Sequence, residues 1–506
     1  MTASLANPRS PRALAELLAA LPDGALVAVT GPRALAVDHF SQDSREVGAG
    51  GIFIATRGSS WDGHGFIGTA LERGAAVIVA ESPAPEGVGA TWVEIRDAMI
   101  ALAWIAAAWF GHPGREVAVL ATTGTNGKTT TTFLLRSILT AWGKKVGLVS
   151  TVGIHIGERR EPTLFTTPPS PEFQRLLATM RDEGCSHAVV EASSHGLHQH
   201  RIAGFPVAAA GFTNLTRDHL DYHGTMEAYL AAKERLFSEL AERACICIDE
   251  PAGRHLAAVF AAAKDGAQLI TFSTRGEPAS LSAQEVRSDL TGVRASIVRA
   301  DGSHFSLTTP LVGRHNLENA LTAYGMALLA GVPHDVILAA LATATGAPGR
   351  LQRVPAARGP IVLVDYAHTP DALVNVLSAI APLVHDQGGQ LTCVFGAGGD
   401  RDKGKRPEMA AIAARLADRV IATSDNPRTE DPEAILDDIA RGFPDGFTFA
   451  RIADRRQAIT NAIASARAED AVLVAGKGHE DYQIIGTTKH PFDDVAVARA
   501  ALEVWA

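Results

Sequence analysis

The chain has 506 residues, of which 46% are hydrophobic and 20% are charged, a composition that is typical of a folded globular protein and excludes a disordered one. Its 46 Lys and Arg residues against 55 Asp and Glu residues give a net charge of −9, so nucleic acid is not an expected partner. The 4 cysteines contain no CxxC pair, which argues against a disulfide framework and against a cysteine zinc site.

The first clear element is an apolar run over residues 98–111. It has 14 residues, fewer than the roughly 18–20 that are needed to cross a bilayer, so it predicts a buried helix. No targeting segment is recognised near the N-terminus, because Glu16 interrupts the apolar stretch that follows Arg9 and Arg12. We therefore expect a cytoplasmic protein with no membrane span.

Clusters of Gly and Pro at residues 111–114 and 346–349 are typical of breaks between structural units. They predict three domains, over residues 1–112, 113–345 and 346–506, and each has an ordinary domain size.

The last two of these segments alternate short apolar runs with helical patterns. In the C-terminal segment the runs lie at residues 361–367, 391–397, 419–424, 447–453 and 471–477. This alternation predicts an α/β fold with a mostly parallel, doubly wound sheet. Ligands of such sheets bind at the carboxyl ends of the strands, so the polar residues that follow each run are candidates for function.

Residues 123–130 have the pattern of a phosphate-binding loop, since they follow the apolar run 117–120 and open a helical stretch. The candidate phosphate-binding residues are Thr123, Gly124, Thr125, Asn126, Gly127, Lys128, Thr129 and Thr130. Glycines allow backbone N–H groups to face an anion, and the helix N-terminus adds a favourable dipole. Lys128 is expected to reach the β- and γ-phosphates, and the Thr129 hydroxyl to bind Mg²⁺. The chain departs from the strict pattern at Thr122, where glycine is usual.

Three further segments carry candidate metal ligands. Glu191 ends the apolar run 188–191, where a strand end would present its carboxylate beside the phosphate loop. Residues 218–223 contain two Asp and two His; this composition suits a metal site or an ordinary solvated loop, and the spacing leaves both open. Lys233 lies on a helical pattern over residues 226–240, which by itself indicates a surface position.

Several of these segments resemble the motifs of one family, the Mur ligases, which are ATP-dependent amide-forming enzymes of peptidoglycan precursor synthesis. The similar segments are TGTNGKTT, EASSHGL, NLTRDHLDYHG, GRHNLENA, VDYAHTP and GKGHE, and the resemblance runs from Asp43 to Asp494. It implies a uridine-binding first domain, a central P-loop-type ATPase domain with a mostly parallel sheet, and a C-terminal Rossmann-like doubly wound domain that binds an amino acid. It also implies ATP and Mg²⁺ as cofactors and small-molecule substrates, and we expect a monomer.

The resemblance assigns catalytic roles to Lys128, Glu191, His219 and Lys233. It implies that Thr129, Glu191, His219 and Lys233 are the metal ligands, with Lys233 modified to carbamyl-lysine. Carbamylation turns a cation into an anionic ligand, which suits a site that must hold Mg²⁺.

The resemblance also implies three groups of substrate-binding residues. The UDP-dipeptide is expected to contact Ser44, Ser59, Ser60, Trp61, Thr166, Thr167, Ser193, Gln199 and Arg201. ATP is expected to contact Asn316, Asn319, Arg350 and Asp365 in addition to the phosphate loop. The amino acid is expected to contact Arg401, Asp425, Asn426, Pro427, Arg428, Gly476 and Glu480.

Within the family, the chain resembles the ligases that add the third amino acid, and residues 425–428 (DNPR) resemble the motif of those that add meso-diaminopimelate. This amino acid has one carboxylate more than lysine, and Arg428 can pair with it through two parallel hydrogen bonds. The expected reaction joins meso-diaminopimelate to UDP-N-acetylmuramoyl-L-alanyl-D-glutamate through an acyl phosphate made with ATP.

Three alternatives remain. One is the sister ligase that adds L-lysine, and another is a P-loop nucleotide-binding module without ligase activity. The third is folylpolyglutamate synthase, which shares the phosphate loop but has no uridine-binding first domain, whereas this chain has the Asp43-Ser44-Arg45 segment.

Overall fold

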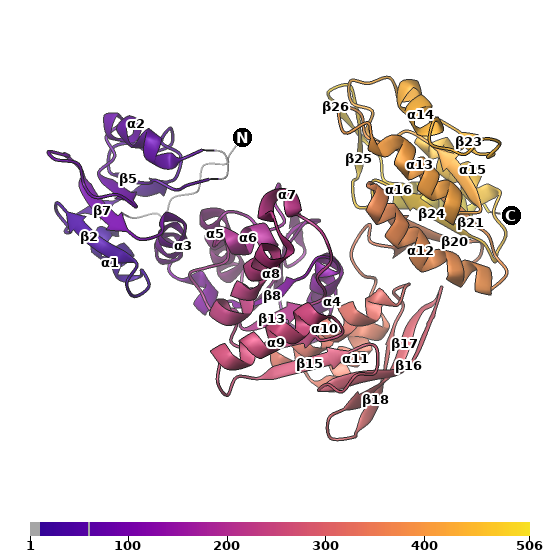
Figure 1. Cartoon of the computed structure of the whole chain (residues 1–506), viewed down its shortest axis with the longest axis horizontal. Coiled ribbons are helices and arrows are strands. Elements are labelled where there is room, and N and C mark those ends of the chain that lie inside the picture. Colours follow the sequence, from indigo (N-terminus) through magenta and orange to yellow (C-terminus); the bar gives the residue numbers. More distant parts are fainter. Residues whose placement is uncertain (1–10, 59–60, 506) are drawn as a thin grey trace. The chain divides into compact units, whose positions relative to one another are not determined.

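The computed structural model describes residues 11–58 and 61–505, which form an α/β protein (Figure 1). The described residues divide into two compact units. The first contains the residues up to Phe272 together with Thr322–Pro333, and the second contains Ser273–Leu321 and the residues from His334 onward. In the part of the chain that the structure describes, no helix is long and apolar enough to cross a membrane.

The N-terminal part of the first unit is built on a five-stranded sheet in the order β2-β7-β6-β5-β4. Its strands are β2 (Leu26–Thr30), β4 (His39–Ser41), β5 (Gly51–Ile54), β6 (Val77–Ala80) and β7 (Thr91–Ile95); its helices are α1 (Leu14–Ala19), α2 (Ile67–Glu72) and α3 (Ala98–Trp109), and β1 (Arg12–Ala13) pairs with β3 (Ala36–Val37). Strands β4 to β7 are parallel and β2 is antiparallel. The predicted buried helix is confirmed as α3. Asp97 Oδ1 caps this helix by accepting from the backbone N–H groups of Met99 and Ile100.

The rest of the first unit contains a larger sheet in the order β11-β10-β9-β12-β8-β13-β14-β15. Its strands are β8 (Ala118–Thr123), β9 (Val146–Ser150), β10 (Gly153–Ile156), β11 (Arg159–Glu161), β12 (His187–Glu191), β13 (Ala209–Phe212), β14 (Ala244–Cys247) and β15 (Leu269–Ser273); its helices are α4 (Lys128–Ala141), α5 (Ser170–Asp182), α6 (Ser194–His198), α7 (Leu220–His223), α8 (Met226–Arg235) and α9 (Pro251–Ala263). The strands from β9 to β15 in this order are parallel, and β10 and β11 are antiparallel. The carboxyl ends of β8, β12 and β13 therefore meet at one edge.

The second unit contains an antiparallel set of strands, β16 (Leu281–Asp289), β17 (Gly292–Arg299) and β18 (His304–Thr309), and the helix α11 (His334–Ala342). Helix α10 (His315–Leu329) begins in this unit.

The C-terminal sheet has the order β19-β20-β24-β21-β22-β23 and is parallel apart from β19. Its strands are β19 (Gln352–Arg353), β20 (Ile361–Asp365), β21 (Leu391–Phe395), β22 (Arg419–Ala422), β23 (Ala450–Arg451) and β24 (Ala471–Ala475), with a separate hairpin of β25 (Tyr482–Ile485) and β26 (Thr488–Pro491); the helices are α12 (Pro370–Asp386), α13 (Lys405–Leu416), α14 (Pro432–Ala440), α15 (Arg455–Ala464) and α16 (Asp494–Glu503).

Alternate residues of the C-terminal strands are buried in two different cores. Leu363 and Leu473 belong to the core that includes α12, α13 and α14, whereas Val362 and Val472 belong to the core that includes α15 and α16. Helices therefore cover both faces of the sheet, as the buried apolar runs predict. The doubly wound fold is confirmed.

One local prediction differs from the structure and another is confirmed with a change of helix type. The apolar run 447–453 supplies only the two-residue strand β23, because it lies at the sheet edge with exposed side chains at Ala450 and Arg451. The helical pattern 226–240 is confirmed: α8 ends at Arg235, and residues Leu236–Leu240 continue it as a π-helix.

Candidate active site

The phosphate loop joins β8 to α4 in the predicted strand–loop–helix order. Two of its glycines, Gly124 and Gly127, have φ values of 152° and 86°, which side chains disfavour. A Cβ atom at Gly124 would lie 1.9 Å from Thr213 Oγ1, so this position has no room for a side chain. The departure at Thr122 has a simple reason: Thr122 is still part of β8 and pairs with Glu191 and Gly211, so glycine is not required there.

Lys128 begins α4 and lies across its own loop. Its Nζ donates to the backbone carbonyls of Gly124 at 2.9 Å and Thr125 at 2.8 Å. The ammonium group is thereby held next to the backbone N–H groups at the helix N-terminus, which is the place where phosphate is bound in loops of this type.

A second segment supports the phosphate loop from the carboxyl end of β13. Asn214 accepts two hydrogen bonds of 2.9 Å from the loop, one at its carbonyl from Thr125 N and one at Oδ1 from Asn126 N. Thr216 N donates to Thr125 Oγ1 at 3.0 Å. Sequence analysis missed this role because Asn214 lies 88 residues from Asn126. Its position shortly after the apolar run that forms β13 was the one sequence feature that could have indicated this role.

Lys233 is buried beneath the same loop, with 1% of its surface exposed. Its Nζ donates to Gly124 O at 2.9 Å. Burial lowers the pKa of Lys233 well below its usual value, and the nearby charge of Lys128 lowers it further, whereas Asp218 opposes the shift. The helical pattern alone indicated a surface position and was wrong.

Glu191 ends β12 and its side chain is fully buried. Its carboxylate is held by one residue that sequence analysis missed, Thr151, which donates from its backbone N to Oε1 at 3.0 Å and from its hydroxyl to Oε2 at 3.2 Å.

His219 is part-exposed and has a left-handed φ of 53° just before α7. Burial lowers its pKa, the carboxylate of Asp218 opposes this shift, and the charges of Lys128 and Lys233 add to it. Among the residues described, no group of three or more His, Cys, Asp or Glu side chains is placed to hold a metal ion. The expected ligand set contains only two residues of these types, Glu191 and His219.

A cavity of about 500 Å³ in the first unit is lined by several residues that were expected to bind the UDP-dipeptide. Among the residues that line it are Trp61, Phe165, Gln199, Arg201 and Tyr222. Arg201 donates to Gln199 Oε1 from Nε at 3.0 Å and from Nη2 at 2.6 Å, and Gln199 Nε2 donates to the Tyr222 hydroxyl at 2.9 Å. Tyr222 was missed as a member of this group.

Three other residues that were expected to bind the UDP-dipeptide, Thr166, Thr167 and Ser193, lie near the end of β12, the strand that carries Glu191. Thr167 Oγ1 donates to Glu191 O at 2.7 Å and accepts from Ser193 N at 3.1 Å, and Arg201 Nη1 donates to Thr167 O at 2.7 Å. The hydroxyls of Thr166 and Thr151 are 3.0 Å apart. The structure thus brings these residues together beside the phosphate loop's strand. Ser44 is buried in the N-terminal part, and Ser59 and Ser60 lie outside the described residues.

Asn316 and Asn319, which were expected to contact ATP, are buried near the start of α10. Asn316 Nδ2 donates to Val312 O, and Asn319 Nδ2 donates to Asn316 Oδ1, each at 2.8 Å.

Arg350 and Asp365 lie by the carboxyl end of β20. The Arg350 guanidinium lies 5.3 Å from the centre of the Tyr366 ring. Asp365 accepts from the backbone N–H groups of Leu351 at 2.7 Å and Ala367 at 2.9 Å. Burial raises its pKa, although those two hydrogen bonds favour the ionised form.

The expected amino-acid site lies at the carboxyl ends of β21, β22 and β24. Asn426 Nδ2 donates to Glu480 Oε2 at 2.9 Å, and Asn426 Oδ1 accepts from Lys477 Nζ at 3.1 Å. Lys477 is fully buried and also donates to Glu480 Oε2, at 3.2 Å. A Cβ atom at Gly476 would lie 2.6 Å from Asp425 Oδ2, so these two residues are also in close contact. Sequence analysis missed Lys477.

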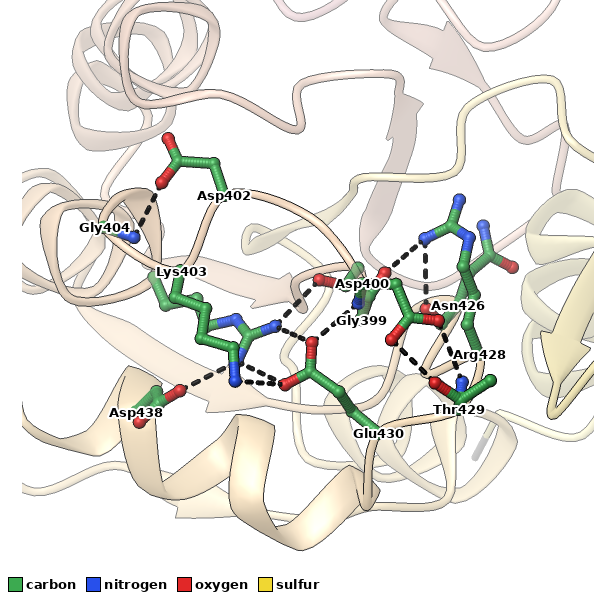
Figure 2. A network of polar contacts seen from close by, with 12 residues as sticks. Gly399, Asp400, Asp402, Lys403, Gly404, Asn426, Arg428, Thr429, Glu430 and Asp438 are labelled. Carbon is green, nitrogen blue, oxygen red and sulfur yellow. Dashed lines mark hydrogen bonds and ion pairs between the residues drawn. The ribbon is translucent and has the colours of Figure 1, made fainter.

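Two arginines border the Gly-rich loop after β21. Arg428, which has a left-handed φ of 52° after Pro427, donates from Nη1 to Gly399 O at 2.8 Å. Figure 2 shows its other terminal nitrogen directed away from this contact. Among the described residues, Nε and Nη2 of Arg428 have no hydrogen-bond partner. Arg401 lies on the same side, because a Cβ atom at Gly398 would be 3.0 Å from Arg428 Nη1 and 3.7 Å from Arg401 Cγ.

The fold and these sites define the class: a multidomain α/β enzyme of the P-loop type. Three family models match the chain: "Mur ligase family, catalytic domain" over residues 37–110, "Mur ligase middle domain" over residues 122–327, and "Mur ligase, glutamate ligase domain" over residues 349–478. The chain belongs to the Mur ligase family.

Curated relatives match over nearly the full length. UDP-N-acetylmuramoyl-L-alanyl-D-glutamate–2,6-diaminopimelate ligase of Synechococcus elongatus is 43% identical, covering 97% of this chain and 98% of the relative. The protein of the same name from Pseudomonas aeruginosa is 42% identical, covering 94% of this chain and 96% of the relative.

Solved structures also match this chain. A structure of a ligase with that name matches with a TM-score of 0.73 at 34% identity, covering 98% of this chain and 99% of the other. MurF ligase from Thermotoga maritima, in complex with ADP, shares the fold with a TM-score of 0.54 at 20% identity, covering 92% and 98% of the two chains.

Proposed function

We propose that this chain is an ATP-dependent ligase that adds meso-diaminopimelate to the γ-carboxylate of D-glutamate in UDP-N-acetylmuramoyl-L-alanyl-D-glutamate, during synthesis of peptidoglycan precursors. The observation that carries this proposal is the pair of cationic side chains, Arg401 and Arg428, at the strand ends that also carry Glu480. Two guanidinium groups suit the extra carboxylate of diaminopimelate, and Glu480 suits its ammonium group.

The phosphate loop and the residues around it are proposed to bind ATP with Mg²⁺. The donors that suit Mg²⁺ are the Thr129 hydroxyl and the buried carboxylate of Glu191. Unmodified Lys233 is a poor ligand, but its lowered pKa favours the neutral amine, which is the form that reacts with CO₂. The amine and CO₂ then give an anionic carbamate and release one proton. This modification adds a second anionic oxygen donor, which is the kind of ligand that suits Mg²⁺, and His219 is a further proposed ligand.

The reaction has two steps in this proposal. The substrate γ-carboxylate attacks the γ-phosphoryl group of ATP, which releases ADP and leaves an acyl phosphate. The amine of meso-diaminopimelate then attacks the acyl carbon, and phosphate leaves. When bound, Mg²⁺ supplies positive charge that offsets the repulsion between the anionic reactants.

The chain's own residues bring these anions together. Lys128 stabilises the transferred phosphoryl group, and the loop N–H groups orient it. Arg201 is proposed to hold the UDP-dipeptide, since Gln199 and Thr167 fix its guanidinium in the cavity. We also propose that residues 1–112, 113–345 and 346–506 act as three domains that bind the sugar nucleotide, ATP and the amino acid, and that they close before chemistry.

The alternative amino acid is L-lysine. It lacks the distal carboxylate, so Arg428 would face no anion in that complex. Folylpolyglutamate synthase from Thermotoga maritima shares the fold at 19% identity but covers only 74% of this chain, so part of this chain has no counterpart in it.

One experiment tests the proposal. Purified protein is incubated with ATP, Mg²⁺ and the UDP-dipeptide, with meso-diaminopimelate, L-lysine or L-glutamate added in separate reactions, and products are identified by mass. We expect one amide product, with meso-diaminopimelate, and one ADP for each amide. ADP release without any amide product would contradict ligase function.

A further inference from the structure

The two loops that carry Arg401 and Arg428 are joined by side chains to which no role has been assigned so far. We call residues 398–403 the glycine loop and residues 425–430 the arginine loop. In each loop an acceptor or donor lies directly beside the arginine: Asp400 precedes Arg401, and Thr429 follows Arg428.

The first link between the loops is made by Asp400. Its Oδ1 accepts from the Thr429 hydroxyl at 2.8 Å, and its Oδ2 accepts from the Thr429 backbone N at 3.2 Å (Figure 2). Asp400 has a left-handed φ of 53°, which non-glycine residues adopt at a cost. Its carboxylate pairs with Thr429, and within the described part of the chain it forms no ion pair with Arg401 or Arg428.

The second link is made by Glu430, whose carboxylate accepts a hydrogen bond from the backbone of Asp400. Glu430 Oε1 accepts from Asp400 N at 2.6 Å and from Arg406 Nη2 at 2.9 Å. Glu430 Oε2 accepts from Arg406 Nη1 at 3.0 Å and lies 3.1 Å from Lys403 Nζ. The hydrogen bonds from Arg406 lower the pKa of Glu430 to about 2, so this carboxylate is ionised at every pH above roughly 4.

The base of this arrangement is rigid. Arg406 lies in the first turn of α13 and its side chain is fully buried. Its guanidinium donates to Gly398 O at 3.1 Å and to Asp438 Oδ2 on α14 at 2.8 Å. Both loops are thus tied to packed helices through one guanidinium group. Figure 2 shows the chain of contacts running from Asp438 through Glu430 to Asp400 and Thr429.

Long arginine side chains lose rotamer freedom when a ligand orders them. A scaffold that fixes the backbone on both sides before the ligand arrives reduces that loss and strengthens binding. The contacts of Asp400, Thr429 and Glu430 have this form, because they fix the backbone next to each arginine without pairing with either one.

We propose that Asp400, Thr429 and Glu430 form a clamp that positions Arg401 and Arg428 for the distal carboxylate of the incoming amino acid, and so sets the preference for a dicarboxylic substrate over lysine. This inference rests on the proposed function. The three side chains are positioning residues, since they act through the two arginines.

The test uses Thr429→Val, which removes the hydroxyl and keeps the shape, and Asp400→Ala. We expect the KM for meso-diaminopimelate to rise about 5- to 30-fold in each variant. The values of kcat and of the KM for ATP and for the UDP-dipeptide should stay within about 2-fold of those of the unmutated protein. The slow use of L-lysine should stay unchanged, so selectivity falls by the same factor. Thr429→Ser should recover most of the loss.

The chain offers a matched control in Thr291→Val. Thr291 makes the same pair of contacts to an aspartate, from its N at 2.6 Å and its hydroxyl at 2.5 Å to Asp289 Oδ1, in the turn between β16 and β17. This variant should leave every kinetic constant unchanged. The double variant Asp400→Ala/Thr429→Val should be no worse than the poorer single variant, because both remove the same link.

The possible outcomes distinguish a failure of the clamp proposal from a failure of the proposed function. If the unmutated protein makes the diaminopimelate product and Thr429→Val leaves its KM unchanged, or raises the KM for ATP equally, the clamp is wrong while the function stands. Additive losses in the folded double variant would also overturn the clamp. If the unmutated protein makes no product with meso-diaminopimelate, the proposed function fails and the clamp fails with it.

Discussion

The phosphate loop and the amino-acid site are built in different ways. Backbone groups dominate the first: Lys128 and Lys233 donate to loop carbonyls, and loop N–H groups donate to Asn214. Side-chain charges dominate the second, where Glu430 and Arg406 connect two loops. Nearly any nucleoside triphosphate meets the same backbone donors, whereas the position of a few guanidinium and carboxylate groups can discriminate one amino acid from another. Catalytic power and substrate choice are therefore separable by mutation.

The largest effect is expected at the phosphate loop. Lys128→Ala should reduce turnover by at least about 10³-fold, because it removes the charge that we propose faces the transferred phosphoryl group. The thermal unfolding midpoint should hardly change. Amide formation measured by product mass checks the first expectation. The control is Lys144→Ala, since Lys144 lies beyond the C-terminal end of α4 with its Nζ over the Trp142 ring. Normal turnover of folded Lys128→Ala would contradict the assignment.

Lys233→Ala should lower activity by at least about 10²-fold, since it removes a proposed metal ligand. Small carboxylates in the medium should restore part of the activity. Because the pKa of Lys233 is lowered, the reactive neutral amine is present at a lower pH than in ordinary lysines, and the carbamate should form near neutral pH. Carbon-13 NMR with labelled bicarbonate measures it directly. No carbamate signal at neutral pH in the presence of Mg²⁺ and ATP would count against this modification.

Arg428→Ala should weaken the use of meso-diaminopimelate by about 30-fold or more, which corresponds to losing roughly 2 kcal/mol or more from a desolvated charge pair. The KM for ATP should stay the same, in contrast to Lys128→Ala. Steady-state kinetics with each substrate varied in turn make the comparison. A loss shared equally by ATP and the amino acid would show that the two regions are not separable.

The smallest effect is expected in the cavity of the first unit. Tyr222→Phe removes the hydroxyl that accepts from Gln199, and Gln199 in turn holds Arg201. We expect the KM for the UDP-dipeptide to rise about 5-fold, because the hydroxyl loses its contacts with Gln199 and with His198 Nδ1. The constants for ATP and the amino acid should not move. A larger effect on kcat than on this KM would mean that Tyr222 contributes to the chemical step.

The sequence predicted what depends on neighbouring residues. The strand–loop–helix order around Lys128, the buried helix α3 and the doubly wound C-terminal sheet follow from local patterns. The burial of Lys233 was not visible in its helical pattern, because it results from packing against a loop 109 residues away.

For the proposed amino-acid site, the resemblance supplied residues 425–428 together with Arg401, Gly476 and Glu480, but not the side chains that support them. Glu430, Arg406 and Lys477 were not singled out, since their contacts to this site span 24 to 51 residues. A charged side chain near a motif gives no sign in the sequence of the partner it will meet. Strand β23 shows the same limit for the fold, because an apolar run cannot indicate that it will lie at a sheet edge.

The most direct measurement is the ratio of kcat/KM for meso-diaminopimelate to that for L-lysine in the unmutated protein, with ATP and the UDP-dipeptide saturating. A positioned Arg428 that is left without an anion in the lysine complex predicts a preference of about 30-fold or more for meso-diaminopimelate. Comparable values for the two amino acids would contradict the account.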